Sequence, residues 1–193
     1  MRLTVYGGAG EVGGNQILLQ EKSTSLMLDF GRNFNRESKY FTDPFLQARE
    51  LEDLRTLELL PPLDYLYKKE GESPVSAILL SHAHLDHMDY IRYIRNPHVR
   101  VWAGEGTWRI ICAREIIRPR RREYRLAEAP GREHEREEKG RLDGIPIYVN
   151  FGKFRTGDEF QVGEFNVCPV HVDHSVPGSY GYIIAVSYTH LRA

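Results

Sequence analysis

The stretch Ser81-His82-Ala83-His84-Leu85-Asp86-His87 decides what kind of molecule this chain forms. It directly follows an apolar run, Val75 to Leu80, which predicts a buried strand. Residues two apart on an extended segment project to the same side, so the side chains of His82 and His84 can converge on one ion. The sequence therefore predicts a metal site where this strand ends.

Asp86 and His87 open the helix predicted over Asp86 to Arg95, where they can face a second ion nearby. Imidazole and carboxylate groups suit zinc, manganese or iron. The two cysteines, Cys112 and Cys168, form no CxxC pattern and are expected to be small core residues rather than thiolate ligands. A polar loop that is histidine-rich without binding metal is the alternative interpretation, and the density of ligand residues favours the metal site.

Around this motif, strand and helix patterns alternate in a way that predicts a layered α/β domain. Between Arg32 and Pro74 the pattern is irregular, with one or two short helices expected in Pro44 to Leu60. A helix is expected over Thr107 to Ile117. Strands are expected at Arg2 to Tyr6, Gln16 to Glu21, Ser25 to Phe30, Val75 to Leu80, Val99 to Ala103, Ile145 to Phe151, Glu159 to Val162, Glu164 to Val172 and Tyr180 to Val186.

The HxHxDH pattern of residues 82–87 is the signature of the metallo-β-lactamase superfamily, and the chain resembles that superfamily beyond this motif. Asp29, which closes the strand Leu26-Met27-Leu28, matches the family's first aspartate, so the resemblance implies that it orients ligands from behind them. A helix or turn cap is its alternative role. The segment His171 to Gly181 resembles the third family motif in the form found in ribonuclease J and related β-CASP nucleases. The resemblance thus implies that His174 completes the first metal site.

The glycine-rich opening, Gly7 to Asn15, also resembles ribonuclease J-type chains. The implied fold is a metallo-β-lactamase-like αββα sandwich over residues 1–186, incomplete at its C-terminus, with residues 187–193 expected to be a non-native tail. The family's next ligand, a bridging aspartate, would follow His174 by a little over twenty residues. Asp86 and His87 are therefore expected to form an incomplete half of a second site.

The activity implied is metal-dependent hydrolysis of a phosphodiester, with RNA as the substrate and a metal-bound hydroxide as the nucleophile. Two Zn²⁺ ions are expected per complete site, with manganese or iron as alternatives. Asp86 and His174 are the expected catalytic residues among the ligands; Ser175 and Ser179 could offer hydroxyl groups to a phosphate or simply cap their turn. Alternatives are a thioesterase or lactonase on the same fold, and a truncated metal-binding domain without activity.

Two other motifs have competing interpretations. Gly8 to Gly13 satisfies GxGxxG after a strand, as in a dinucleotide site, but no long helix is expected after it. Arginines between Arg118 and Arg125 could contact phosphate, yet the glutamates at 133–138 weaken that cluster, so a solvated loop or surface helix is favoured. His98 and His134 are expected on the surface, and His171 in the core or behind the ligands.

Composition narrows the class of protein only moderately. The chain has 193 residues, 41% hydrophobic and 27% charged, with a formal net charge of −1. This charge neither supports nor excludes nucleic acid as a partner. No apolar run is long enough to span a bilayer and no signal peptide is recognisable, so we expect a cytoplasmic protein without a membrane partner; the oligomeric state is left open.

Overall fold

The computed structural model describes residues 1–42, 50–118, 121–131 and 137–186. Its helical segments are α1 (Phe34–Glu37), α2 (Leu51–Thr56), the 3-10 helix η1 (Asp64–Leu66), α3 (Leu85–Met88), the 3-10 helix η2 (Asp89–Tyr93), α4 (Glu105–Ile117) and the 3-10 helix η3 (Arg122–Tyr124). Its strands are β1 (Arg2–Gly7), β2 (Gln16–Glu21), β3 (Thr24–Leu28), β4 (Val75–Leu80), β5 (Arg100–Gly104), β6 (Gly140–Leu142), β7 (Ile145–Ile147), β8 (Phe151–Phe154), β9 (Phe160–Val162), β10 (Phe165–His171) and β11 (Tyr180–Val186).

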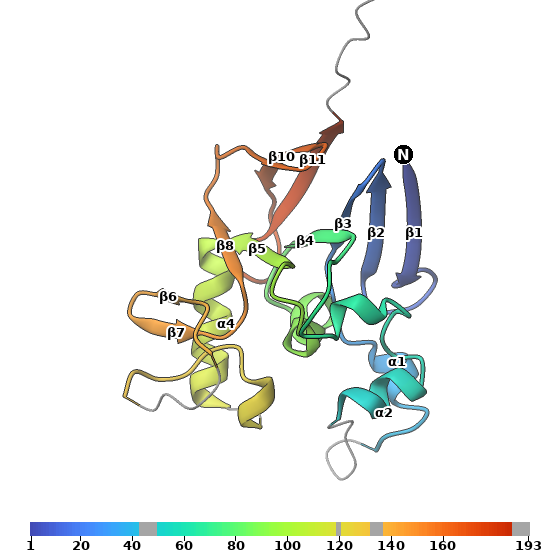
Figure 1. Ribbon diagram of the computed structural model, residues 1–193. Coiled ribbons are helices and arrows are strands. Elements are labelled where there is room, and N and C mark those ends of the chain that lie inside the picture. The colour runs from blue at the N-terminus through green and yellow to red at the C-terminus, as the bar shows by residue number, and fades with distance from the viewer. Residues whose placement is uncertain (43–49, 119–120, 132–136, 187–193) are drawn as a thin grey trace, which may run out of the picture.

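The largest sheet has the strand order β1-β2-β3-β4-β5-β8. Its first three strands are antiparallel, whereas β3, β4, β5 and β8 run parallel. A second sheet has the order β11-β10-β9, and β6 pairs with β7 in a small ribbon. In Figure 1 most of the helical chain lies in the lower part of the view, below β4 and β5, whereas β10 and β11 lie above these two strands.

The alternation of side chains along β4 explains this layering. Ile78 and Leu80 belong to the core cluster that includes helical residues, whereas Ala77 and Leu79 belong to the cluster shared with the second sheet. Successive residues of a strand point to opposite faces, and all four are fully buried here. Because β4 is buried on both faces, its end has a fixed position. The residues that follow it, 81–87, are therefore well placed to form a site.

The predicted strands are confirmed with small changes at their ends, apart from Ile145 to Phe151, which was wrong as one strand. Its first half is β7, and its second half leads into β8, which pairs with β5. Between them, the backbone N–H of Tyr148 donates to the carbonyl of Leu126, which takes the chain out of either ladder.

The continuous helix predicted over Asp86 to Arg95 is also wrong, because the chain forms the single turn of α3 and then the 3-10 helix η2. Neighbouring segments occupy the carbonyls that a longer helix would use. The carbonyl of Asp86 accepts from the N–H of Asn15, and that of His87 accepts from the N–H of Phe30. Because these groups bond outward, α3 is held against two loops rather than extended.

Three further expectations can be placed. The helix expected within Pro44 to Leu60 is present as α2. Residues 44–49, His134 and the tail 187–193 lie outside the described residues. No helix within the described ranges is long and apolar enough to cross a membrane. Gly8 to Gly13 is followed by strand β2, antiparallel to β1, and not by a helix, which argues against the dinucleotide interpretation.

Candidate metal centre

Three imidazoles meet where β4 ends. His82 and His84 lie on the loop after β4, and His174 lies on the loop between β10 and β11. One ring nitrogen from each residue lies within 4.8 Å of the other two. His82 Nε2 is 3.0 Å from His84 Nδ1 and 3.2 Å from His174 Nε2. The structure therefore brings together the three residues expected to hold the first ion.

These separations can be tested against the geometry of a bound ion. Zinc–nitrogen bonds of 2.0–2.1 Å in a tetrahedral arrangement place neighbouring nitrogens roughly 3.3–3.4 Å apart. The two measured N···N distances, 3.0 and 3.2 Å, are slightly shorter. Small side-chain rotations would therefore admit a cation, and a donor set of three imidazoles suits a transition metal such as zinc.

Two hydrogen bonds hold the loop of His174, one to the end of β4 and one to α4. The N–H of Tyr180 donates to the carbonyl of Ser81 at 2.9 Å. On the other side of the loop, Thr107 Oγ1 in α4 donates to the carbonyl of Gly178 at 2.8 Å. A Cβ on Gly178, whose φ is +76°, would lie only 3.2 Å from Gly106, so a glycine suits this close approach.

Asp86 and His87 stand beside the three imidazoles. His87 Nε2 lies 3.6 Å from Asp86 Oδ2, and the rings of His82 and His87 have their centres 4.0 Å apart. Within the described residues only His82, His84 and His174 form a group of three possible ligands, so Asp86 and His87 remain the two-residue half-site that the sequence predicts.

Asp29 lies behind this cluster and accepts three hydrogen bonds. Its Oδ1 accepts from the backbone N–H of Ser81 at 2.7 Å, while its Oδ2 accepts from Ser81 Oγ at 2.8 Å and faces His87 Nδ1 at 2.7 Å. Ser81 Oγ also lies 2.9 Å from His82 Nδ1. With protons on both Nδ1 atoms all these contacts are satisfied, and both Nε2 atoms keep a lone pair.

Ser81 and Asn15 both contact the cluster, although the sequence alone predicts no role for either. Asn15 Nδ2 lies 3.1 Å from His87 Nε2. The signal in the sequence was the run of glycines before Asn15, because Gly13 and Gly14 both have positive φ and leave space for the neighbouring loops. A Cβ on Gly13 would lie 2.8 Å from Asp86 Cβ, so this turn lies directly against the half-site.

The electrostatics differ between the two central histidines. Burial, followed by the neighbouring imidazoles of His87, His174 and His84, lowers the pKa of His82 to about 4. Burial also acts to lower the pKa of His87, but the hydrogen bond and charge of Asp29, with the charge of Asp86, outweigh it and raise that pKa. His82 is thus neutral at pH 7, the state in which an imidazole binds a metal.

Other polar residues of the His174 loop have more ordinary positions. Ser179 is buried and its Oγ donates to the carbonyl of Val176, so it caps the turn and is not available to a phosphate. Ser175 is exposed. His171 is exposed against the ring of Tyr180 and is not a core residue, and His98 is exposed as expected.

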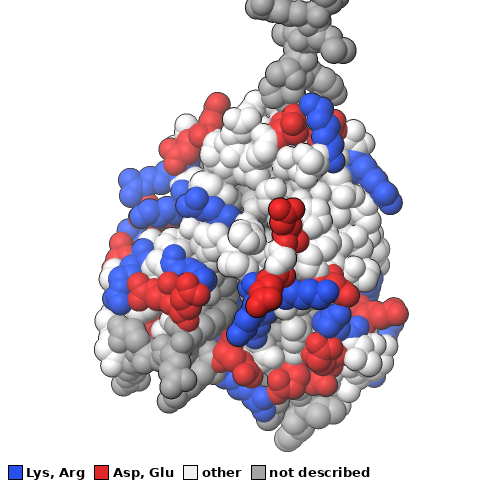
Figure 2. Space-filling model, viewed as in Figure 1, with Lys and Arg blue, Asp and Glu red and all other residues white. Residues whose placement is uncertain are grey.

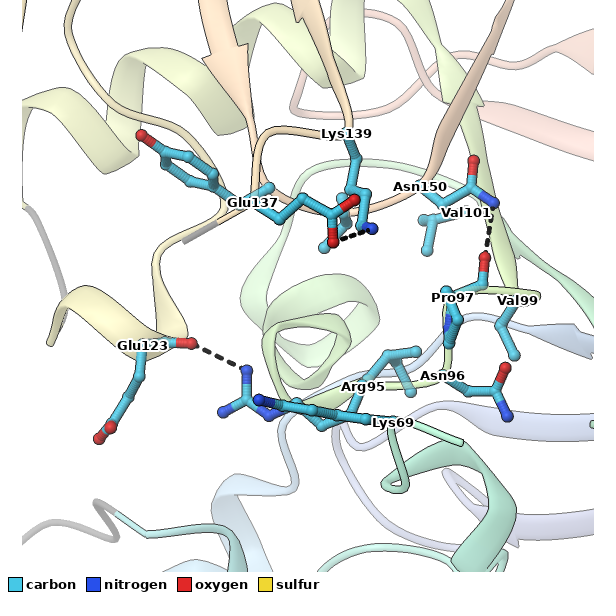
Figure 3. A pocket seen from close by; sticks show the side chains of 13 residues that line it. Lys69, Arg95, Asn96, Pro97, Val99, Val101, Glu123, Glu137, Lys139 and Asn150 are labelled. Atoms are coloured by element: carbon cyan, nitrogen blue, oxygen red, sulfur yellow. Dashed lines mark hydrogen bonds and ion pairs between the residues drawn. The ribbon is translucent and has the colours of Figure 1, made fainter. Parts of the chain in front are cut away.

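A separate cavity of about 750 Å³ contains none of these residues (Figure 3). Val99, which precedes β5, and Val101, near the start of β5, line it. Because β4 and β5 are parallel, this cavity lies at the end of the strands opposite the histidines. Lys139 lines it too, but its ammonium is paired with Glu137 at 2.6 Å. The cavity is therefore not part of the metal centre.

Comparison with known proteins agrees with this geometry. A family model described as a beta-lactamase superfamily domain matches residues 39–191. The chain belongs to the metallo-β-lactamase superfamily. Ribonuclease J of Helicobacter pylori strain 26695 is 26% identical over 94 residues, which are 49% of this chain and 11% of that protein. The same enzyme of strain B128 gives the same values, so the chain spans about a tenth of the length of these relatives.

Solved structures show the same superfamily fold. A protein of unknown function from Enterococcus faecalis V583 aligns with a TM-score of 0.65 and 24% identity over 95% of this chain and 40% of that one. The metallo-beta-lactamase fold protein YhfI of Bacillus subtilis aligns with a TM-score of 0.51 and 13% identity over 95% of this chain and 57% of that one. These likenesses show the fold alone, a mixed α/β arrangement consistent with an αββα sandwich.

Proposed function

We propose that this member of the superfamily hydrolyses phosphodiester bonds in RNA with the help of divalent cations, with Zn²⁺ as the resident metal. The observation that carries the proposal is the convergence of His82, His84 and His174, whose nitrogens lie within 4.8 Å of one another although the last two are 90 positions apart in the sequence. A side-chain arrangement assembled across two sheets in this way is typical of a ligand set.

The residues of the site would have the following roles. His82, His84 and His174 hold the first cation, while Asp86 and His87 supply part of a second position. Asp29 contacts the ring of His87 directly and that of His82 through Ser81, and so orients both rings toward the cluster. A bound cation supplies a Lewis acid that activates water and stabilises charge on phosphate oxygens.

The position of each residue also suits access by a substrate. His82 is buried at the end of β4, whereas His174 is exposed and Asp86 is partly exposed. The exposed side of the cluster is where a scissile bond can approach, with Asp86 close enough to accept a proton or hold a water. Catalytic roles for Asp86 and His174 are part of this proposal.

RNA as the substrate is supported by the ribonuclease J relatives and by the motif around His174. The match to ribonuclease J covers only 94 residues at 26% identity. A thioesterase or lactonase could use the same ligand residues, because the fold does not determine the substrate. A direct comparison of substrates must therefore separate these two kinds of hydrolase.

The test replaces His82 and His84 with alanine, in this chain and in any longer protein that contains it. Metal is measured by elemental analysis, and activity on 5′-labelled RNA and on a panel of thioesters. We expect both metal content and RNA cleavage to be lost, because two of three imidazole ligands are gone. His98→Ala, which removes an exposed histidine outside the cluster, is the matched control. Retained cleavage in the double variant, or hydrolysis of thioesters alone by the unaltered protein, would refute the proposal.

A further inference from the structure

A groove runs between the α3–η2 segment and helix α4, with a cavity of about 690 Å³. Leu85, Met88 and Arg92 line one side at helical spacing, and Arg114 and Arg118 line the other. The first side is formed by α3 and η2, and the second by α4 and Arg118, the residue that directly follows it.

The floor of the groove is closed by a buried ion-pair network. The guanidinium of Arg92 contacts the carboxylate of Asp89 at 2.5 Å and that of Glu115 at 3.1 Å, and all three side chains are at most 6% exposed. Both carboxylates are thus engaged with a buried cation. They do not compete for the two arginines at the rim.

The rim arginines differ from the other arginines nearby. Arg121 pairs with Glu50, Arg125 with Glu128, and Arg109 with Glu105. Within the described part of the chain, neither Arg114 nor Arg118 has a carboxylate within ion-pair distance, and both are exposed. On the face shown in Figure 2 acidic and basic side chains mostly lie beside one another.

The groove begins at the metal centre. Arg114 Nη1 donates to the carbonyl of Ala83 at 3.2 Å, and Ala83 lies between His82 and His84. Leu85, which lines the groove, directly follows His84. Arg118 lies one helical turn further from this point, next to the highly exposed Ile117.

We propose that this groove binds the phosphate backbone of the substrate strand on one side of the scissile bond. Arg114 lies on α4 and Arg118 directly follows this helix; the N–H of Arg118 donates to the carbonyl of Arg114 at 2.8 Å, so the two residues lie one turn apart. Each can contact a different phosphate of one extended strand, while Leu85 and Ile117 offer apolar surface to the sugars or bases. The inference rests on the proposed function, because it names the contacts of that substrate outside the metal centre.

The test is binding of a short fluorescein-labelled single-stranded RNA to the zinc-loaded chain, followed by fluorescence anisotropy over a series of salt concentrations. Arg118→Gln is the decisive variant, because Arg118 contacts no metal-centre residue. Arg114→Gln is paired with Arg114→Lys, which keeps the charge. The matched control is Arg109→Gln, on the same helix and ion-paired with Glu105.

We expect Arg118→Gln to weaken RNA binding up to about fivefold at low salt. It should also reduce the slope of log affinity against log salt by about 0.7, the value for one phosphate contact on a single strand. Metal content should be unchanged. If unaltered protein cleaves RNA and Arg118→Gln behaves like Arg109→Gln, the groove proposal alone is overturned. If the unaltered protein neither binds nor cleaves RNA, the proposed function fails and the groove proposal fails with it.

Discussion

Replacing Asp29 by asparagine should weaken metal binding without unfolding the protein. Asparagine is nearly the same size and, like aspartate, tolerates the left-handed backbone at this position, where φ is +57°. Its oxygen can still accept from the N–H of Ser81. Its amide group, however, cannot accept the proton that His87 Nδ1 donates to Asp29 Oδ2 at 2.7 Å.

The magnitude follows from that lost acceptor. To keep a hydrogen bond with the new amide, His87 must move its proton to Nε2, which removes the lone pair facing Asp86. The link through Ser81 Oγ to His82 Nδ1 is disturbed by the same change. Loss of such a supporting carboxylate typically costs 10–100-fold in metal affinity, which corresponds to about 1.4–2.7 kcal/mol.

The assay is zinc titration against a chromophoric chelator, with the tautomer of His87 read by ¹⁵N NMR of its ring. Asp143→Asn is the matched control, since Asp143 also has a positive φ, of 49°, but lies in the turn between β6 and β7. An Asp29→Asn protein that binds zinc within twofold of the unaltered chain, with the His87 proton still on Nδ1, would refute this reasoning.

Three other predictions concern stability. Gly31→Ala should unfold the chain or lower its free energy of unfolding by about 3 kcal/mol or more, because the new Cβ would lie 1.6 Å from the carbonyl oxygen of Asp86. The control is Gly106→Ala, whose Cβ meets only ordinary contacts, so this variant should melt near the temperature of the unaltered protein. Arg92→Met should lower the free energy of unfolding by about 3–5 kcal/mol, since it leaves two buried carboxylates without their cation; urea unfolding measures this, and a loss below 1 kcal/mol would contradict it. Metal-free protein should lose stability as pH falls from about 6.5 to about 4, because unfolded His82 takes up a proton there while folded His82, with a pKa of about 4, does not. Solvent screening limits that loss of stability to on the order of 1–2 kcal/mol. If the free energy of unfolding of a His82→Gln variant depends on pH just as steeply, protonation of His82 is excluded as the cause.

Local patterns in the sequence predicted the strands well, because their signals are local. β4 and β11 have the predicted bounds, Val75–Leu80 and Tyr180–Val186. The predicted helix after His84 was too long, since the carbonyls that would extend it bond to Asn15 and Phe30, which are distant in the sequence. Long-range contacts of this kind have no local signal.

The same distinction applies to the candidate site. The pattern of residues 82–87 points to a metal site by itself, because strand geometry places its histidines together. The approach of His174 depends on the contact of Tyr180 with Ser81 and of Gly178 with Thr107, which only the folded chain shows. Family resemblance, not periodicity, was therefore the basis for predicting His174 as a ligand. Ser81 links Asp29 to His82 through its hydroxyl group, and this contact too is visible only in the folded chain.

The origin of the three imidazoles in different layers has a mechanical consequence. His82 and His84 extend from the large sheet, whereas His174 belongs to the hairpin of the small one. A cation held by all three would cross-link the two layers and close a loop of 90 residues between His84 and His174. Detachment of the hairpin would then require release of the ion, so the melting temperature would rise with the concentration of free metal. At a free metal concentration of a hundred times the dissociation constant, the free energy of unfolding would be about 2.7 kcal/mol higher.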